Sequence, residues 1–374
     1  MSKEKNKLLS RKTHGDFALL IAVCLLAITG TVFIYSASNY SALATYGDGF
    51  YFVKKQALGI ALGIIAMTVT ALYDYNKLKK FNVAVAIIAV ITLALVFVPV
   101  IGVENYGAKR WIGFGGVTIQ PSEIAEFSLI LFSATYLSKH PERQESFLGI
   151  MPVLIFGIIL CLLIILEPNM SITTCVLMLT FTMLFVGGMK IKHLLLLVLP
   201  AILAGVVLIL VEPYRLSRLT AFLNPWSNPK GEGYQLLQSL YALGSGGWFG
   251  VGLFRSRQKY AFLPFAESDF ILSVIGEEIG FFGMILFFAL LGFIIFRGLK
   301  IAYKASNMFG FIMSVGITMI FGIQTVVNAL VVTGSIPPTG LPLPLVSSGK
   351  TSIIIFMAEM GVLFNVSKQR ELTF

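Results

Sequence analysis

Long apolar runs limit what this chain can fold into more than any other feature of its sequence. Each run is about as long as the ~17–25 residues that a helix needs to cross the hydrocarbon core of a bilayer. The runs are continuously apolar rather than alternating, which excludes a transmembrane β-barrel. We therefore expect an all-α polytopic membrane protein, a ten-span transmembrane helical bundle with spans at 17–36, 57–73, 82–102, 122–137, 147–166, 170–188, 194–211, 270–296, 309–333 and 351–366.

The composition agrees with lipid as the main solvent. Hydrophobic residues make up 57% of the 374 residues and charged residues 12%, whereas a soluble domain has roughly 25% charged residues. The net charge of +10 does not indicate a nucleic-acid partner, because no basic run is interleaved with aromatic residues. No metal site is expected either, since neither the cysteines nor the histidines have a metal-ligand spacing: Cys24, Cys161, Cys175, His14, His140 and His193.

The distribution of Lys and Arg predicts the topology. The N-terminal tail and every second loop after it carry 17 of these residues, while the short loops on the other side carry 5: Lys54, Lys55, Lys109, Arg110 and Lys350. The positive-inside rule places the richer side in the cytoplasm. We expect a multi-pass protein of the bacterial plasma membrane, with cytoplasmic tails at 1–16 and 367–374.

One connection is much longer than the others. Residues 212–269 form a predicted extracellular loop between spans seven and eight, and loops of this length are usually functional. Within it, Tyr234–Leu243 places Leu236, Leu237, Leu240 and Tyr241 on one helical stripe, which predicts an amphipathic interfacial helix. No second domain is indicated, so residues 1–374 are expected to form a single membrane domain.

Carboxylates lie near the predicted outer ends of several spans. Glu123, in the first turn of the fourth span, fits a plain helix-terminal carboxylate and a functional one equally well. Glu167 lies in the turn Leu166-Glu-Pro-Asn-Met170, and the sequence alone favours a residue at the membrane–water interface. Asp269 could simply cap the eighth span. Glu277 and Glu278 lie deeper in that span and are either functional or paired with a cation of another span.

Together these residues bring acids and cations to the outer membrane face beside lipid. This arrangement suits a substrate with an anionic head, a sugar portion and a lipid tail. A carboxylate near a hydroxyl can act as a general base, and cations can stabilise a departing pyrophosphate.

Several separated motifs, in order, give the sequence a family resemblance. They read GAKRWI, QPSE, LEPNM, FLNPW, GEGYQLLQSLYALGSGGWFGVGLFRSRQKYAFLP, SDFILSVIGEEIGFFG and TGLPLPLVSSGKTS. The chain resembles the SEDS proteins (the RodA, FtsW and SpoVE group) from its first span to Val366. The stretch Phe222 to Lys259 looks closer to the FtsW and SpoVE branch than to RodA.

The resemblance implies a function and a set of site residues. SEDS proteins are ten-span peptidoglycan glycosyltransferases that polymerise lipid II on the outer face, usually with a class B penicillin-binding protein as partner, in a process of cell division or sporulation. The family's essential aspartate maps to Asp269, which would deprotonate the acceptor hydroxyl. The predicted substrate contacts are Glu123, Lys109, Arg110, Glu167, Arg218, Ser256, Lys259 and Lys350. No cofactor follows with certainty, and a divalent cation is left open.

Two other functions are compatible with the sequence, and departures from the family pattern support one of them. The family usually has Lys at position 126, Asp at 169, Glu at 265 and Gly at 350, where this chain has Glu126, Asn169, Phe265 and Lys350. They would suit a weakened paralogue that acts as a scaffold for a penicillin-binding protein. A flippase for a lipid-linked precursor is the third reading, although neither an inverted repeat nor an interrupted helix is clear in the sequence.

The departures at 126 and 350 suggest one specific compensation. Glu123 and Glu126 lie three residues apart on one helical face, where two carboxylates would repel each other. Lys350 would neutralise them if the start of the tenth span approached the fourth. The alternative is that Glu126 stays hydrated and Lys350 extends to the membrane interface.

Overall fold

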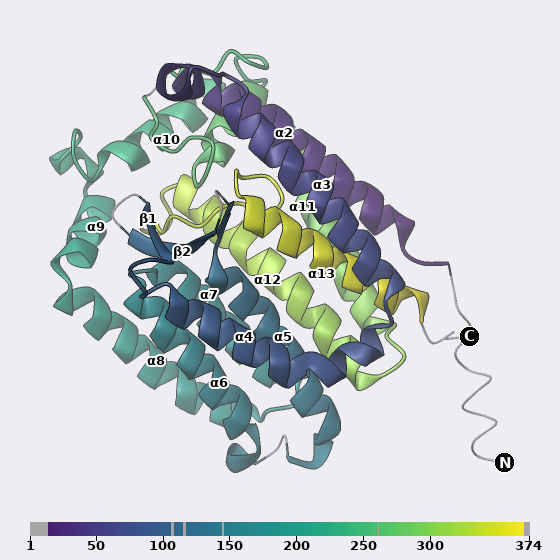
Figure 1. The fold of residues 1–374 in the computed structure, drawn as a ribbon. Helices are drawn as coiled ribbons and strands as arrows, with labels where there is room; N and C mark the ends of the chain where they lie inside the picture. The colour runs from purple at the N-terminus through teal and green to yellow at the C-terminus, as the bar shows by residue number, and fades with distance from the viewer. Residues whose placement is uncertain (1–13, 106–107, 115–116, 144–145, 261, 370–374) are drawn as a thin grey trace.

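The computed structural model of the chain describes residues 14–105, 108–114, 117–143, 146–260 and 262–369. Long helices run roughly alongside one another in a bundle (Figure 1). They are α2 (Phe17–Tyr46), α3 (Tyr51–Leu72), α4 (Asn82–Leu95), α5 (Pro121–Lys139), α6 (Phe147–Leu166), α7 (Met170–Val186), α8 (Ile191–Val211), α11 (Ile271–Tyr303), α12 (Met308–Val332) and α13 (Lys350–Lys368). Short 3-10 turns η1 (Tyr75–Phe81) and η2 (Pro141–Arg143) precede α4 and α6.

The expectation of a helical membrane protein is confirmed. Among the described residues, eight helices are long and apolar enough to cross a membrane, with η1 and α4 counted together. The other two long helices are α7, with 17 residues, and α5, which carries two glutamates in its first turns. Both pack between neighbouring helices. The number of ten crossings stays a prediction.

Several expected spans have different ends in the structure; for example, α3 begins at Tyr51 instead of 57, and α11 continues to Tyr303 instead of 296. Helix α2 continues beyond the apolar run, which ends at residue 36, to Tyr46. It ends there because Gly47 adopts the left-handed conformation that closes a helix. The third span ends at Leu95 instead of 102, because residues 102–105 form strand β1 (Gly102–Asn105). This strand pairs with β2 (Ala108–Phe114), which pairs with β3 (Val117–Ile119), in a small antiparallel sheet of order β1-β2-β3.

Polar side chains start several helices. Asp16 accepts a hydrogen bond from the backbone N–H of Leu19 at the start of α2, and Asn169 and Asn307 do the same for α7 and α12. These caps satisfy N–H groups that would otherwise lack partners at helix N-termini. Asn169 thus fills a role that Asp fills equally well, so the departure at this position preserves the local structure.

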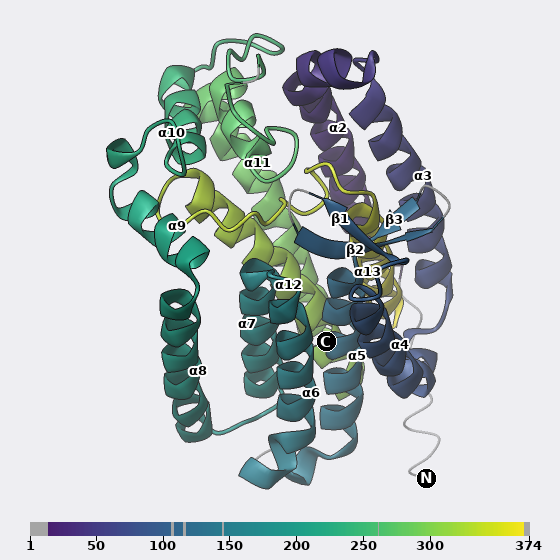
Figure 2. The same cartoon turned by 60° about the vertical axis from the view of Figure 1, so that its left-hand side comes forward.

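Helices α12 and α13 form the centre of the bundle, and α8 stands at its edge. In the apolar windows of α12 and α13, 72% of residues are buried, while in α8 none is. Figure 2 shows α8 below α9 and set apart from the central helices. An apolar helix without protein contacts on most of its surface is stable only when lipid surrounds it.

One end of the bundle is tied together by polar contacts. The backbone N–H of Asp16 donates to Ser367 Oγ (2.8 Å), and the Asp16 carboxylate pairs with Arg297 (2.5 Å). Asn365 accepts from the backbone of Tyr75 (3.0 Å). The start of α2 and the end of α13 therefore share this end, where described basic residues predicted to be cytoplasmic also lie, among them Arg297 and Lys368. The orientation in the membrane remains a prediction.

The long connection between α8 and α11 is folded. It contains α9 (Pro213–Leu223), η3 (Pro225–Ser227) and α10 (Tyr234–Gly246), which lie toward the other end of the bundle (Figures 1 and 2). Helix α10 packs on α11, for example through Ser239, whose hydroxyl lies 2.7 Å from that of Ser273. Leu236 and Leu237 are each 2% exposed, whereas Leu240 and Tyr241 are exposed. The predicted helix is present, but only half of its apolar stripe is buried.

Candidate functional site

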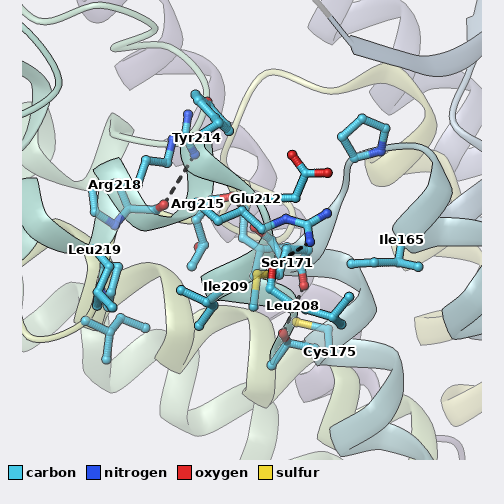
Figure 3. A pocket seen from close by; sticks show the side chains of 18 of the residues that line it. Ile165, Ser171, Cys175, Leu208, Ile209, Glu212, Tyr214, Arg215, Arg218 and Leu219 are labelled. Carbon is cyan, nitrogen blue, oxygen red and sulfur yellow. Dashed lines mark hydrogen bonds between the residues drawn. The ribbon is translucent and has the colours of Figure 1, made fainter. Parts of the chain in front are cut away.

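A cavity of about 730 Å³ lies between the α6–α7 pair, the α8–α9 junction and the segment 336–341 (Figure 3). Its deeper wall is apolar and comes from α6, α7, α8 and α12, for example Met178, Leu208 and Val327. Three arginines from separate parts of the chain line it as well: Arg110, Arg215 and Arg218. Glu212 lines the cavity too, so it joins an apolar compartment to a polar one in which three arginines outnumber one carboxylate.

The three arginines are held by backbone carbonyls. Arg110, on β2, donates to the carbonyl oxygens of Glu167 (3.4 Å) and Pro168 (2.5 Å). Arg215 donates to Leu208 O (2.9 Å), and Arg218 donates to Pro338 O (3.4 Å). Carbonyl acceptors fix the guanidinium groups without cancelling their charge. Such a cluster, walled by low-dielectric protein, attracts an anionic group.

Asp269 lies beside this cavity, behind the segment 338–341. A Cβ atom on Gly340 would lie 3.3 Å from Asp269 Oδ2, and the neighbours Thr339 and Leu341 line the cavity. Asn328, on α12, donates to the backbone carbonyls of Asp269 (2.8 Å) and Leu341 (2.7 Å). The aspartate is therefore fixed to the wall of the cavity through its own backbone.

Asp269 is not a helix cap. Phe270 occupies the cap position of α11, and no side chain caps this helix. Partial burial raises the pKa of the Asp269 carboxyl, while Arg218 and Arg110 act in the opposite direction. A raised carboxyl pKa moves the group closer to neutral pH, where a general base works best.

Glu167 is buried next to Arg110 and is not exposed at a membrane surface. It is 0% exposed, and neither carboxylate oxygen has a hydrogen-bond partner among the described residues. Burial raises the pKa of Glu167 to about 8, with Arg110 opposing the shift. The group is thus mainly neutral at pH 7.

Glu277 and Glu278 bind a backbone loop, which neither sequence interpretation anticipated. Glu277 accepts from the backbone N–H groups of Arg257 (3.0 Å) and Gln258 (3.5 Å) and from the Ser256 hydroxyl. Glu278 accepts from the backbone of Ser256 (3.2 Å) and from the hydroxyl of Ser36. Ser256, predicted to contact substrate, is 0% exposed and instead anchors the loop to α11.

Helix α11 is interrupted where this loop meets it. Gly280 has φ of +66°, and a Cβ atom there would lie 2.2 Å from the backbone nitrogen of Gly250. The backbone groups freed by the break bond to the loop, as in Phe281 N to Gly247 O (2.9 Å) and Val251 N to Glu277 O (3.0 Å). No interruption was predicted here, although the closely spaced glycines in 276–283 are a sequence signal for one.

Glu123 and Glu126 lie inside the bundle, and Lys350 does not neutralise them. Glu126 accepts two hydrogen bonds from Gln324 on α12 (2.9 and 3.2 Å). Glu359, on α13, is a third buried acid within electrostatic reach of both. Across the described ranges no ion pair joins Lys350 to either glutamate. Lys350 lies instead within electrostatic reach of Tyr51. Neither alternative raised for these residues fits, because among the described residues Lys350 pairs with neither glutamate and Glu126 is buried rather than hydrated.

The remaining predicted contacts are spread out. Lys109 is exposed on β2, and Lys259 donates to the carbonyl of Phe254. Of the predicted residues, Arg110 and Arg218 line the cavity, with Asp269 and Glu167 next to it. Glu123, Ser256, Lys259 and Lys350 are not among its lining residues.

Comparison with known proteins gives a consistent result. Residues 17–372 match the family model of the FtsW, RodA and SpoVE cell cycle proteins. Stage V sporulation protein E of Bacillus subtilis (strain 168) is 38% identical over 360 residues, which cover 96% of this chain and 98% of that protein. A protein of Geobacter sp. (strain M18) named "Probable peptidoglycan glycosyltransferase FtsW" is 39% identical over 360 residues, with the same coverage of 96% and 98%.

A solved structure has the same fold. Its description reads "Structural coordination of polymerization and crosslinking by a peptidoglycan synthase complex". One of its chains matches with a TM-score of 0.79 and 26% identity, covering 94% of this chain and 97% of that one.

Proposed function

Because the chain belongs to the FtsW, RodA and SpoVE family of cell cycle proteins, we propose that it is a peptidoglycan glycosyltransferase that polymerises lipid II. The observation that carries the proposal is Asp269, held beside a cavity that combines three arginines with an apolar wall. A lipid-linked pyrophosphate requires both features, because its tail must stay in an apolar medium while its phosphates need cations.

In the proposed reaction Asp269 acts as the general base. It takes the proton of an acceptor sugar hydroxyl, whose oxygen attacks the anomeric carbon of the lipid-linked donor. The new glycosidic C–O bond forms as the C–O bond to the pyrophosphate breaks. The lipid pyrophosphate leaves with the electron pair, and Arg110, Arg215 and Arg218 stabilise its charge.

The proposed site also assigns a role to Glu167. Its carboxyl lies against Arg110, whose side chain is bound by the 167–168 backbone. A neutral carboxyl there leaves the charge of Arg110 available to the leaving group. An ionised one would compete with the pyrophosphate for the guanidinium.

A class B penicillin-binding protein is the proposed partner, and the outer membrane face is the proposed side of the site. The structural relative described as a synthase complex of polymerization and crosslinking supports the partner. The excess of basic residues at the opposite end of the bundle supports the orientation. The names of the relatives favour an enzyme over a flippase or a weakened scaffold.

The direct test uses purified full-length protein in lipid vesicles with lipid II, with and without the penicillin-binding protein. We expect glycan strands that are resolved on a gel. Lipid II flipping without any polymer would support the flippase instead. Binding of the penicillin-binding protein with no polymer, whether or not that partner is present, would support the scaffold.

A further inference from the structure

A second, smaller cavity lies next to the first. Its volume is about 280 Å³, and it is lined by the long connection between α8 and α11 together with Pro338. Tyr214, Arg218 and Pro338 line both cavities. The Arg218 guanidinium donates to Pro338 O (3.4 Å) and lies 4.6 Å from the centre of the Tyr214 ring. Arg218 therefore forms part of the wall between the two cavities.

The smaller cavity differs in chemistry from the larger one. Four aromatic rings line it, those of Tyr214, Phe222, Tyr234 and Phe265. Aromatic faces carry negative charge density, and the C–H groups on the flat face of a sugar ring pack against them favourably. Among the described residues that line it, Arg218 is the single cationic one. This cavity is thus suited to a neutral ring more than to a phosphate.

Polar side chains complete the lining. Glu232 accepts from the Ser217 hydroxyl (2.7 Å), and a carboxylate has further lone pairs for sugar hydroxyls. Gln235 donates to the carbonyl of Pro264 (3.1 Å), which links α10 to the chain leading to Asp269. Acceptors at the edge of an aromatic cavity are the groups that bind the hydroxyls of a stacked sugar.

Phe265 has an unusual backbone conformation at this cavity. Its φ is +54°, a region that a bulky side chain rarely adopts and that occurs mostly where the surroundings enforce it. The backbone N–H of Ser268 donates to Phe265 O (3.0 Å), which closes a turn just before Asp269. The turn places the Phe265 ring in the cavity wall and Asp269 four residues further on.

We propose that the smaller cavity binds one neutral pyranose ring of the acceptor glycan. This inference rests on the proposed glycosyltransferase function. The larger cavity has the arginines and the apolar wall for the donor's pyrophosphate and lipid, so the acceptor sugar belongs on the other side of Arg218. Pockets for drug-sized ligands measure roughly 300–1,000 Å³, and 280 Å³ therefore suits a single ring.

The test uses a soluble glycan tetrasaccharide as a competitor in the polymerisation assay. We expect it to inhibit the wild type, and its inhibitory concentration should rise at least about fivefold in Phe265→Ala and in Gln235→Ala. Phe265→Tyr keeps the ring and should stay within about twofold. These factors follow from the loss of one stacked ring or one well-placed polar contact, on the order of 1–3 kcal/mol.

A second inhibitor separates the two cavities. Undecaprenyl pyrophosphate should inhibit the wild type and both alanine variants equally, because its groups belong in the larger cavity. Equal tetrasaccharide inhibition of the wild type and the alanine variants, or none of the wild type, would overturn the sugar site while polymerisation continued. A wild type that forms no polymer at all would instead contradict the proposed function.

Discussion

The side-chain amide of Asn328 donates to the backbone carbonyl of Asp269 at 2.8 Å and to that of Leu341 at 2.7 Å. Asn328 is 1% exposed and comes from the central helix α12. Ser347 adds a bond from its hydroxyl to the carbonyl of Ser268 (2.6 Å). The chain around the proposed base is thus bound to two other parts of the molecule, so its position depends on residues that need not touch the substrate.

Asn328→Ala should therefore reduce kcat for lipid II polymerisation by about 10- to 100-fold, because a small displacement of a reacting group has effects of this size. Steady-state kinetics checks it. Gln324→Ala is the matched control. It also removes a side-chain amide from α12, one turn before Asn328, but the Gln324 amide donates to Glu126 and not to the chain around Asp269. The control should change thermal stability and leave kcat within a few-fold. Equal losses of kcat in both variants would argue against a positioning role for Asn328.

Arg218 should set the acid limb of the pH profile. It lowers the pKa of the Asp269 carboxyl, which burial raises. Removing the cation in Arg218→Ala raises that pKa further, so activity should be lost at a higher pH as the solution is acidified. The measurement is kcat/KM against pH.

Arg215→Ala is the matched variant for this experiment. It lines the same cavity, but it is not among the groups that shift Asp269. Both variants should bind the pyrophosphate more weakly, and only Arg218→Ala should move the acid limb. An identical limb in the two variants would contradict the assignment.

The loop held by Glu277 should become accessible when that carboxylate is removed. Glu277→Ala leaves the buried N–H of Gln258 and the part-buried N–H of Arg257 without this acceptor, at a cost of up to about 1–3 kcal/mol for a buried group. Trypsin should then cut after Arg255, Arg257 or Lys259 several times faster than in the wild type. Glu104→Gln, which changes an exposed carboxylate, should not alter the digestion. An unchanged cleavage pattern in Glu277→Ala would show that other contacts hold the loop.

Glu167 should make stability fall as pH rises. Its pKa is about 8 in the folded protein and roughly 4.3 in an unfolded chain. Between these values the folded state retains a proton that the unfolded state has lost, so raising the pH favours unfolding. Glu167→Gln has a neutral side chain of the same shape at every pH. Its Tm should therefore fall less than the wild-type Tm between pH 6 and pH 9. Parallel Tm curves would contradict the assigned pKa.

The fold was largely predictable from the sequence because lipid imposes a strict length on each apolar run. Helix ends were less predictable from the sequence. Helix α4 ends at Leu95 and residues 102–105 pair with β2, and periodicity alone does not reveal this pairing. The predicted amphipathic helix is present, but tertiary packing determines which of its leucines are buried.

The site was predictable only in part. Asp269 and Arg110 belong to motifs of the sequence and lie close together in the structure, whereas Arg215, Arg218 and Asn328 lie in no motif that we singled out. Ser256 was assigned to the substrate because a sequence pattern does not show that its hydroxyl faces Glu277. The hypothesis that Lys350 neutralises Glu126 required knowing which helices are neighbours, and a sequence pattern does not give this. In the structure the partner of Glu126 is Gln324, a neutral side chain on α12.

Polymerisation by Asp269→Asn tests the central claim most directly. The substitution keeps the shape of the side chain and removes the base. With lipid II and the partner present, the variant should form glycan at least about 100-fold more slowly than the wild type, while its Tm and gel-filtration profile stay unchanged. Asp48→Asn, which alters an exposed carboxylate paired with Lys54, should polymerise normally. Strand synthesis by Asp269→Asn within a few-fold of the wild-type rate would contradict the assignment of Asp269 as the base.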